Sequence, residues 1–406
     1  MLPIKRKFNS AIWRLKQAGI GCYRGALKHF VETLTARYWL LDYVPLLKTH
    51  PPVLLLVRLD LIGDFIIWLD SAQRYRVLYP NHKIVLAVNS SCTALARNLP
   101  FWDEVVSIDV DRLRSNATYR LRVLWGMRVR GFSIAIQPTY SREVVGDSVV
   151  RASNAPQRIG FQGDLNNISE VNKTITDRWY TQLVGNPMTA VSELNINAHF
   201  LRTLGDIDYL SAIFELSRQA ILSDTLKIQQ LYIVVAPGAS WLPKQWPALN
   251  FIELILKLHA DFRLPIVLCG GSNEIELCKH IQASICQDWL INFTGQTTLV
   301  ELVELIRSAT LLVGNDSAPI HMAAVTGTPS ICILGGGHFS RFLPYAPEGV
   351  SNGSEPVIVA YPMECYGCRW KCIYNLDQDQ AVPCVSQVPV LAVYHACSRA
   401  LNLQNA

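Results

Sequence analysis

The stretch that decides the fold is "TLLVGNDSAPIHMAAVTGTPSICILG", residues 310–335. It opens with a continuous apolar run at 310–314, which is typical of a strand buried on both faces of a parallel sheet. A short polar segment follows, and residues 318–326 then have the small side chains of a tightly packed helix, with Pro319 in its first turn. A second apolar run at 330–335 completes the unit. The stretch therefore predicts two parallel strands joined by a helix.

The same alternation of strands and helices runs through most of the chain. In the first half we expect strands at 53–58, 83–88, 105–108 and 132–136, with a helix at about 63–79. In the second half we expect strands at 231–236, 264–270, 291–295, 310–314 and 330–335, and helices at about 248–260, 273–285, 299–308 and 318–326. Region 140–225 is richer in Asn, Ser and Asp, so we expect loops and helices there. Two such series predict an α/β protein with two doubly wound domains facing a central cleft.

This pattern divides the chain into four parts. We expect a basic helical extension at 1–50, a first domain at 51–220, a second domain at 228–385, and a C-terminal helix at 386–406. Half of the 406 residues are hydrophobic and only 17% are charged, so a large core is available and disorder is not expected.

The net charge of +5 is concentrated at the start of the chain, because residues 1–48 hold nine Lys or Arg and two acidic residues. Two interpretations of the extension stay open: helices packed on the body of the protein, or a contact with anionic lipid headgroups. The body has no broad basic face with interleaved aromatic residues, so we expect no nucleic-acid partner.

The chain has eleven cysteines, an odd number. It shows no convincing secretory signal. No apolar run reaches the length of roughly 18–20 residues that a membrane span needs. These features favour a cytoplasmic, reducing location.

Polar residues follow the first strand of the first series. Arg58 ends that strand, and Gly63 and Asp64 open the next helix. A glycine there permits close approach of a backbone or a ligand, and Asp64 lies where a helix dipole favours its ionised form. Asp64 is either a plain helix cap or a general base at the carboxyl end of the strand, where α/β folds bind ligands.

A second set of candidates follows the first strand of the second series, in "APGASWLPKQWP" (236–247). Small residues allow backbone N–H groups and the Ser240 hydroxyl to face an anion, and Lys244 adds positive charge. A solvated surface loop is the alternative. The segment is not a P-loop, because no GxxxxGK[ST] occurs in the chain.

The polar segment of the opening stretch supplies the third set. Asp316 or Ser317 can cap the helix, whose free N–H groups form a site for phosphate, and His321 can donate to a phosphate oxygen. Glu274 follows another strand end, where it can bind ribose hydroxyls. The alternative is a capped helix with a buried histidine.

Taken together, "RLDLIGDFIIWLDSAQRYRVLYP", "PGASWLPKQWP" and "FTGQTTLVELVELIRSATLLVGNDSAPIHMAAVTGTPSICILGG" resemble glycosyltransferase family 9, which contains the ADP-heptose:lipopolysaccharide heptosyltransferases. The resemblance spans roughly residues 53–390. It implies the GT-B fold, with two Rossmann-like domains that hold the acceptor and the nucleotide sugar. It also implies sugar transfer with inversion and without an obligatory metal.

The resemblance assigns roles to single residues. It implies that Asp64 is the catalytic base, with Arg58 and Gly63 on the acceptor side, and that Lys244 and Ser240 bind the donor phosphates. Asp316, Ser317 and His321 match the donor-binding turn, and Glu274 matches the acid that holds the ribose. One departure puts the identity of the donor in doubt: Ala318 stands where the family usually has glycine. The implied partners are ADP-heptose and a glycolipid or glycan acceptor, met by a peripheral protein at the cytoplasmic face of the inner membrane.

Four cysteines gather late in the chain, in "CYGCRWKC" and the following "PC". Cys365, Cys368, Cys372 and Cys384 have spacings that suit a tetrahedral site for zinc or iron. Some related autotransporter heptosyltransferases hold iron in this region. Reduced thiols and a disulfide remain as alternatives, and we do not expect a catalytic role.

Three other functions compete with heptose transfer. The same fold can use another nucleotide sugar for polysaccharide or protein glycosylation. A dinucleotide-dependent oxidoreductase is disfavoured, because neither first strand is followed by GxGxxG. A non-catalytic, metal-bearing envelope scaffold would tolerate replacement of Asp64 and Lys244.

Overall fold

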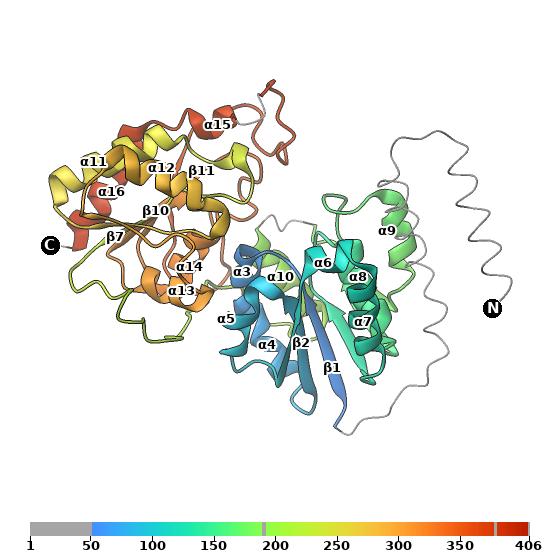
Figure 1. Ribbon diagram of the computed structural model, residues 1–406. Helices are drawn as coiled ribbons and strands as arrows, with labels where there is room; N and C mark the ends of the chain where they lie inside the picture. Colours follow the sequence, from blue (N-terminus) through green and yellow to red (C-terminus); the bar gives the residue numbers. More distant parts are fainter. Residues whose placement is uncertain (1–50, 189–191, 377–379, 405–406) are drawn as a thin grey trace.

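The computed structural model describes residues 51–188, 192–376 and 380–404. Its two α/β halves lie side by side, each built around one parallel sheet (Figure 1). The predicted helical extension at 1–50 lies outside the described residues. Within them, no helix combines the length and the hydrophobicity that crossing a bilayer requires.

The first sheet has six parallel strands in the order β3-β2-β1-β4-β5-β6. The strands are β1 (Val53–Arg58), β2 (Lys83–Asn89), β3 (Glu104–Ile108), β4 (Ile134–Gln137), β5 (Gln157–Phe161) and β6 (Gln182–Val184). The helices are α3 (Ile62–Ala72), α4 (Arg74–Leu78), α5 (Thr93–Arg97), α6 (Val110–Ser115), α7 (Ala117–Arg128), α8 (Val144–Ser153), α9 (Glu170–Asp177) and α10 (Glu193–Thr203). Residues 54–57 of β1 are 0% exposed, as expected for a strand covered on both faces.

The second sheet repeats this topology in the order β12-β11-β10-β7-β8-β9. The strands are β7 (Ile233–Ala236), β8 (Ile266–Leu268), β9 (Leu290–Asn292), β10 (Leu311–Asn315), β11 (Ser330–Leu334) and β12 (Val357–Ala360). The helices are α11 (Ala248–Phe262), α12 (Ile275–Ile285), α13 (Leu299–Arg307), α14 (Ala318–Thr326), α15 (Pro383–Ser386) and α16 (Val390–Gln404). Both sheets thus have the strand order of a doubly wound Rossmann fold.

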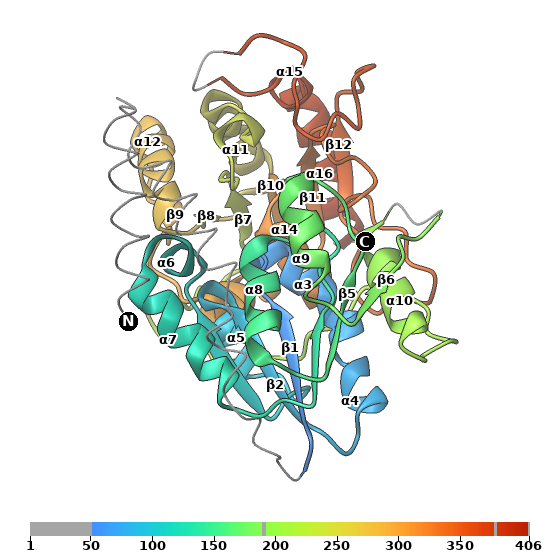
Figure 2. The same cartoon turned by 90° about the vertical axis from the view of Figure 1, so that its right-hand side faces the viewer.

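Helices cover both faces of each sheet. Side chains of α6, α7 and α8 pack on one face of the first sheet, and side chains of α11, α12 and α16 pack on one face of the second. The remaining faces share a single apolar cluster, to which α3, α10, α13 and α14 all contribute. In both views α3 and α14 lie between the two sheets (Figures 1 and 2).

The chain crosses between the two halves along this shared cluster. Residues 204–232 form no helix or strand, and they contact both halves. The backbone N–H of Ala212 donates to the Asp70 carboxylate of α3 at 2.8 Å, and that of Leu216 donates to the Val325 carbonyl of α14 at 2.7 Å. The connection therefore helps to fix how α3 faces α14.

The predicted α/β class and the strands of the 310–335 unit are confirmed. Two expectations are wrong. Region 140–225 contains β5 and β6 as well as three helices; these strands are short and lie toward one edge of the sheet, so their apolar runs are weak. The helix at 63–79 is divided at Gln73 into α3 and α4.

A buried amide holds together the loops that follow β7 and β10. The side chain of Asn315 is 0% exposed, and its Nδ2 donates to the Pro237 carbonyl at 2.7 Å. Its Oδ1 accepts from the Trp246 backbone N–H at 3.0 Å. Trp246 is itself anchored through its indole N–H, which donates to the Val388 carbonyl at 3.0 Å.

This arrangement predicts that Asn315→Ala destabilises the protein. The substitution leaves the Pro237 carbonyl and the Trp246 N–H buried without partners, each costing about 1–3 kcal/mol. We expect the free energy of unfolding, measured with urea, to fall by about 2–4 kcal/mol. Asn402→Ala, an exposed change on α16, is the matched control and should change it by less than about 0.5 kcal/mol. Equal effects of the two substitutions would contradict the role given to Asn315.

Candidate active site

The strand order of each sheet changes direction once, between β1 and β4 and between β7 and β10. Ligands of doubly wound sheets bind beyond the carboxyl ends of the strands at such points. Three of the predicted groups follow β1, β7 and β10, and Glu274 follows β8. The topology therefore gathers the three groups at the two points where binding is expected.

Asp64 lies in the first turn of α3 and is half-buried. Its carboxylate accepts no hydrogen bond from any described residue. Its pKa is raised from 3.8 to about 7, chiefly by burial. The nearby carboxylates of Asp60 and Glu193 also raise the pKa, by more than Arg58 and Arg341 lower it. The side chain is thus poised to exchange a proton near neutral pH, and the helix dipole does not dominate as the sequence suggested.

Arg58 ends β1, close to the backbone of Asp64, and its side chain is 1% exposed. Its Nε is 2.6 Å from the Asp60 carboxylate, and its guanidinium donates to the backbone carbonyls of Pro138 at 3.2 Å and Asp64 at 3.3 Å. These contacts hold the β1–α3 loop against the end of β4. The structure therefore gives Arg58 a supporting position within the first half of the protein.

Gly63 is where the first turns of α3 and α14 meet. A Cβ added to it would lie 3.0 Å from Cδ2 of His321 and 3.8 Å from Cα of Ala318. A larger residue would therefore force the two helices apart. This contact brings the helix turn that carries Asp64 beside the second half of the protein, so the predicted Gly63, Asp64 and His321 belong to one site.

His321 is a neutral imidazole in this position. It is 4% exposed, and burial lowers its pKa to about 4. Its Nδ1 lies 2.5 Å from the hydroxyl of Tyr345, which is also buried. When the tyrosine donates to Nδ1, the Nε2 atom carries the proton and can donate to a ligand. His321 therefore offers a hydrogen bond and not a positive charge.

The N-terminus of α14 has unpaired donors. Ser317 is its N-cap, but the side chain donates to the Asn315 carbonyl at 3.2 Å and does not cap the helix. The backbone N–H groups of Ser317 and Ala318 have no acceptor among the described residues, and Pro319 has no N–H. Such a terminus attracts an anion. Asp316 lies close enough to His321 to favour its protonation electrostatically.

The loop after β7 carries Lys244, a half-buried cation with no carboxylate within ion-pair distance among the described residues. The side chain of Glu274 packs beside the same loop, because a Cβ on Gly238 would lie 2.2 Å from its Cγ. The Glu274 carboxylate accepts no hydrogen bond from any described group. Ser240 is exposed on this loop. Neither the ammonium of Lys244 nor the carboxylate of Glu274 has an ion-pair partner among the described residues, so both are suited to a ligand with anionic and hydroxyl groups.

Sequence reasoning missed Arg341 and Glu193, which tie the two halves together. Arg341 follows β11, and its Nε lies 3.1 Å from the Glu193 carboxylate at the start of α10. Its guanidinium also donates to the Ser141 hydroxyl at 2.9 Å. No local pattern signals this pair, because the partners are far apart in the sequence. Arg341 places positive charge near Asp64 and so limits the rise of its pKa.

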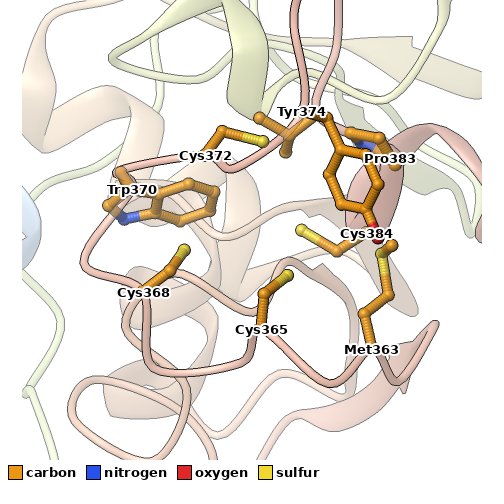
Figure 3. Close-up of a pocket in the computed structure, with 9 residues that line it drawn as sticks. Met363, Cys365, Cys368, Trp370, Cys372, Tyr374, Pro383 and Cys384 are labelled. Atoms are coloured by element: carbon orange, nitrogen blue, oxygen red, sulfur yellow. The ribbon is translucent and has the colours of Figure 1, made fainter.

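The four predicted cysteines line one small cavity, together with Met363, Trp370, Tyr374, Val382 and Pro383 (Figure 3). All four thiols are free. The backbone N–H of Gly336 donates to Sγ of Cys384 at 3.4 Å. Across the described ranges, however, no three side chains of His, Cys, Asp or Glu lie close enough to hold a metal ion.

Known proteins resemble this chain in sequence and in fold. Lipooligosaccharide heptosyltransferase 2 of Campylobacter jejuni (serotype O:2) is 28% identical over 79% of this chain and 93% of its own length. Lipopolysaccharide heptosyltransferase 3 of Escherichia coli is 36% identical, but the match covers 28% of this chain and only 33% of that protein.

Among solved structures, ADP-heptose LPS heptosyltransferase II of E. coli superposes with a TM-score of 0.63 at 18% identity, covering 87% of this chain and all of that one. The dodecameric iron-containing heptosyltransferase TibC superposes with a TM-score of 0.52 at 17% identity, covering 87% of this chain and 78% of that chain. At these identities the likeness shows the fold, which is GT-B.

Two Rossmann-like halves packed side by side are the architecture of the GT-B glycosyltransferases. The profile of glycosyltransferase family 9, described as heptosyltransferase, matches residues 146–366, more than half of the chain. The chain belongs to this family.

The raised pKa of Asp64 predicts a pH-dependent effect on stability. Between about pH 4 and pH 7 the folded state keeps a proton that the unfolded state has released, so Asp64 contributes stability at low pH that is lost as the pH rises. Asp64→Asn cannot ionise. We expect its melting temperature to exceed that of the wild type at pH 8, and the two to converge near pH 4. The exposed control Asp111→Asn should show no such divergence. A less stable Asp64→Asn variant at pH 8 would refute the burial argument.

Proposed function

We propose that this protein transfers heptose from ADP-heptose to a lipopolysaccharide-core or related glycan acceptor, with inversion at the anomeric carbon. The observation that carries the proposal is the contact between Gly63 and His321. It joins the helix turn that carries Asp64 to the first turns of α14, where the N–H groups of Ser317 and Ala318 are unpaired among the described residues. The names of the relatives support heptose and ADP as the components of the donor.

In the proposed reaction, Asp64 accepts the proton of an acceptor hydroxyl. The hydroxyl oxygen attacks the anomeric carbon, and the bond from that carbon to the diphosphate oxygen breaks with its electron pair. A general base contributes about 10²–10⁴-fold when its pKa is close to the working pH, which the pKa of about 7 for Asp64 satisfies. A single displacement of this kind inverts the anomeric centre.

The leaving diphosphate gains negative charge as the bond breaks. Lys244, the N–H groups of Ser317 and Ala318, and the neutral His321 are the donors proposed to receive it. Because these groups are fixed before the reaction, they stabilise the transition state without reorganising. Glu274 would hold the ribose hydroxyls. The chemistry needs no metal ion, since the chain supplies its own donors.

Ala318 leaves a second nucleotide sugar open as the donor. Its side chain packs against the cluster shared by the two halves, beside Gly63. A methyl group in this turn narrows the space near a phosphate or sugar, compared with the glycine usual in the family. Another nucleotide sugar, for polysaccharide or protein glycosylation, is therefore the alternative.

A binding panel tests the donor. Calorimetric titration with ADP-heptose, ADP-glucose, UDP-glucose, GDP-mannose and NAD should show selective binding of ADP-heptose. Lys244→Ala should weaken it about 10²-fold, because a charge-assisted contact to phosphate is lost. Lys257→Ala, a helix-surface change on α11, is the matched control and should bind as the wild type does. Selective binding of another nucleotide sugar would make that sugar the donor in place of ADP-heptose. Binding of NAD alone would overturn the transferase proposal.

We further propose that the four cysteines can close on one structural zinc or iron ion. Their chemistry fits, because four thiols facing one cavity suit a soft metal, and the N–H···S bond to Cys384 is of the kind that supports a thiolate ligand. The distances between the thiols do not fit a bound metal ion, so the thiols would have to approach one another to bind it.

Elemental analysis of protein purified without a histidine tag tests this proposal. We expect close to one zinc or iron atom per chain, and its loss in a Cys368→Ser, Cys372→Ser double variant. The Cys286→Ser variant, which changes an exposed thiol elsewhere, should keep the metal. Metal-free wild-type protein prepared under reducing conditions would exclude the site.

The proposed reaction takes place at the cytoplasmic face of the inner membrane, because its acceptor is anchored there. The basic residues at 1–48 are the proposed lipid contact. In a flotation assay, full-length protein should float with vesicles containing anionic phospholipid and remain behind with neutral vesicles. Protein lacking residues 1–48 should stay at the bottom in both cases. Equal flotation of the two proteins with anionic vesicles would contradict the assignment.

A further inference from the structure

Trp370 links the cysteine cavity to the donor half of the site. It belongs to the segment 361–376, hereafter the Cys loop, and lies between Cys368 and Cys372. The Nζ atom of Lys244 lies 4.4 Å from the centre of its ring. An ammonium over the face of an indole is attracted by the ring, and more strongly where water is excluded. The ring is therefore the one described partner of a lysine that has no carboxylate beside it.

Two glycines at the end of β11 hold the indole in place. A Cβ on Gly337 would lie 2.2 Å from the Trp370 ring, and one on Gly335 would lie 2.8 Å from it. The backbone N–H of Arg369 also donates to the Gly337 carbonyl at 2.8 Å. The glycine run "GGG" at 335–337 is thus required by the Cys loop that packs on it.

The backbone at Trp370 is in an unfavourable conformation. Arg369 and Trp370 have φ values of 54° and 61°, a region that residues with side chains rarely adopt. Two consecutive residues of this kind persist only where their surroundings impose them. Here the surroundings include the backbone hydrogen bonds from Gly367 and Arg369 to the glycine run, and the one from Lys371 to the Cys368 carbonyl. The position of the indole therefore depends on the conformation of the Cys loop.

The indole nitrogen of Trp370 is an unused donor. It is shielded from solvent and has no acceptor among the described residues. Figure 3 shows the ring with its nitrogen turned away from Cys365 and Cys384, so the N–H does not face these thiols. Buried donors nearly always have an acceptor. A phosphate oxygen held by Lys244 would supply one.

We propose that Trp370 is a positioning residue for the donor diphosphate, and that the Cys loop sets its position. The ring holds the ammonium of Lys244, and the indole N–H donates to the same phosphate group. Any change that moves Cys368 or Cys372 then changes the affinity for the donor. The inference rests on the proposed function, since it assigns Lys244 to the diphosphate.

Binding of ADP and of inorganic pyrophosphate, measured by calorimetry, tests the positioning role. Trp370→Leu removes the ring face and the N–H, and should weaken both ligands about tenfold. Trp370→Phe keeps a ring face, so its affinity for both ligands should fall by less. The control Trp125→Leu, on the surface of α7, should bind as the wild type does. Unchanged binding by Trp370→Leu would overturn the proposal.

A double variant separates positioning from a general structural effect. If Trp370 acts through Lys244, then Trp370→Leu should cost much less in a Lys244→Ala background than in the wild type. Equal losses in the two backgrounds would show that the tryptophan only supports the fold. The Trp370→Phe variant keeps the test available if the leucine variant does not fold.

Chemical blocking tests the dependence on the Cys loop. In a Cys286→Ser background, modification of the half-exposed Cys365, Cys368 and Cys372 with N-ethylmaleimide, verified by mass, should weaken ADP binding several-fold. The same treatment should have little further effect on Trp370→Leu. Unchanged ADP affinity after complete modification would overturn the link. If the unmodified wild type binds neither ADP nor a nucleotide sugar, the proposed function fails as well. If the wild type and the Trp370 variants bind ADP and the nucleotide sugar with the same affinity, only this inference fails.

Discussion

The close approach of Gly63 to His321 is the constraint on which the candidate site depends. The two halves are separate sheets, but α3 and α14 meet where one residue has no side chain. This contact places Asp64 beside a helix terminus with unpaired donors. The apolar cluster that spans both halves supplies the stability that holds these polar groups together.

Several polar groups at this junction lower the stability of the folded protein, because they are partly buried without a partner of opposite charge in the described part of the chain. Asp64 is half-buried among carboxylates, Lys244 lacks an acidic partner, and the N-terminus of α14 is not capped. The buried amide of Asn315 and the Arg341–Glu193 pair offset such costs by fixing the surrounding loops. Groups kept unpaired in a rigid frame are suited to a ligand that carries the complementary charges and hydroxyls.

Much of this arrangement could be predicted from the sequence. Continuous apolar runs such as 53–58 and 330–335 specify central parallel strands, and the residues just after them are brought together by the topology alone. The short strand β5 and the edge strands β6 and β12 could not be predicted, because short apolar runs carry little pattern. Arg341, Glu193 and the contact of Trp370 with Lys244 were also missed, since they depend on tertiary packing.

The pH dependence of sugar transfer tests the central claim, that Asp64 is the general base. With ADP-heptose and a heptose-deficient lipopolysaccharide core as substrates, kcat/KM should rise with pH and level off above an inflection near 7, where the Asp64 carboxyl loses its proton. The Asp64→Asn variant should lose at least about 10²-fold in rate together with this inflection. A wild-type profile that is flat between pH 5.5 and 8 (roughly the range that brackets the inflection), or an Asp64→Asn variant with near-normal rates, would contradict the account.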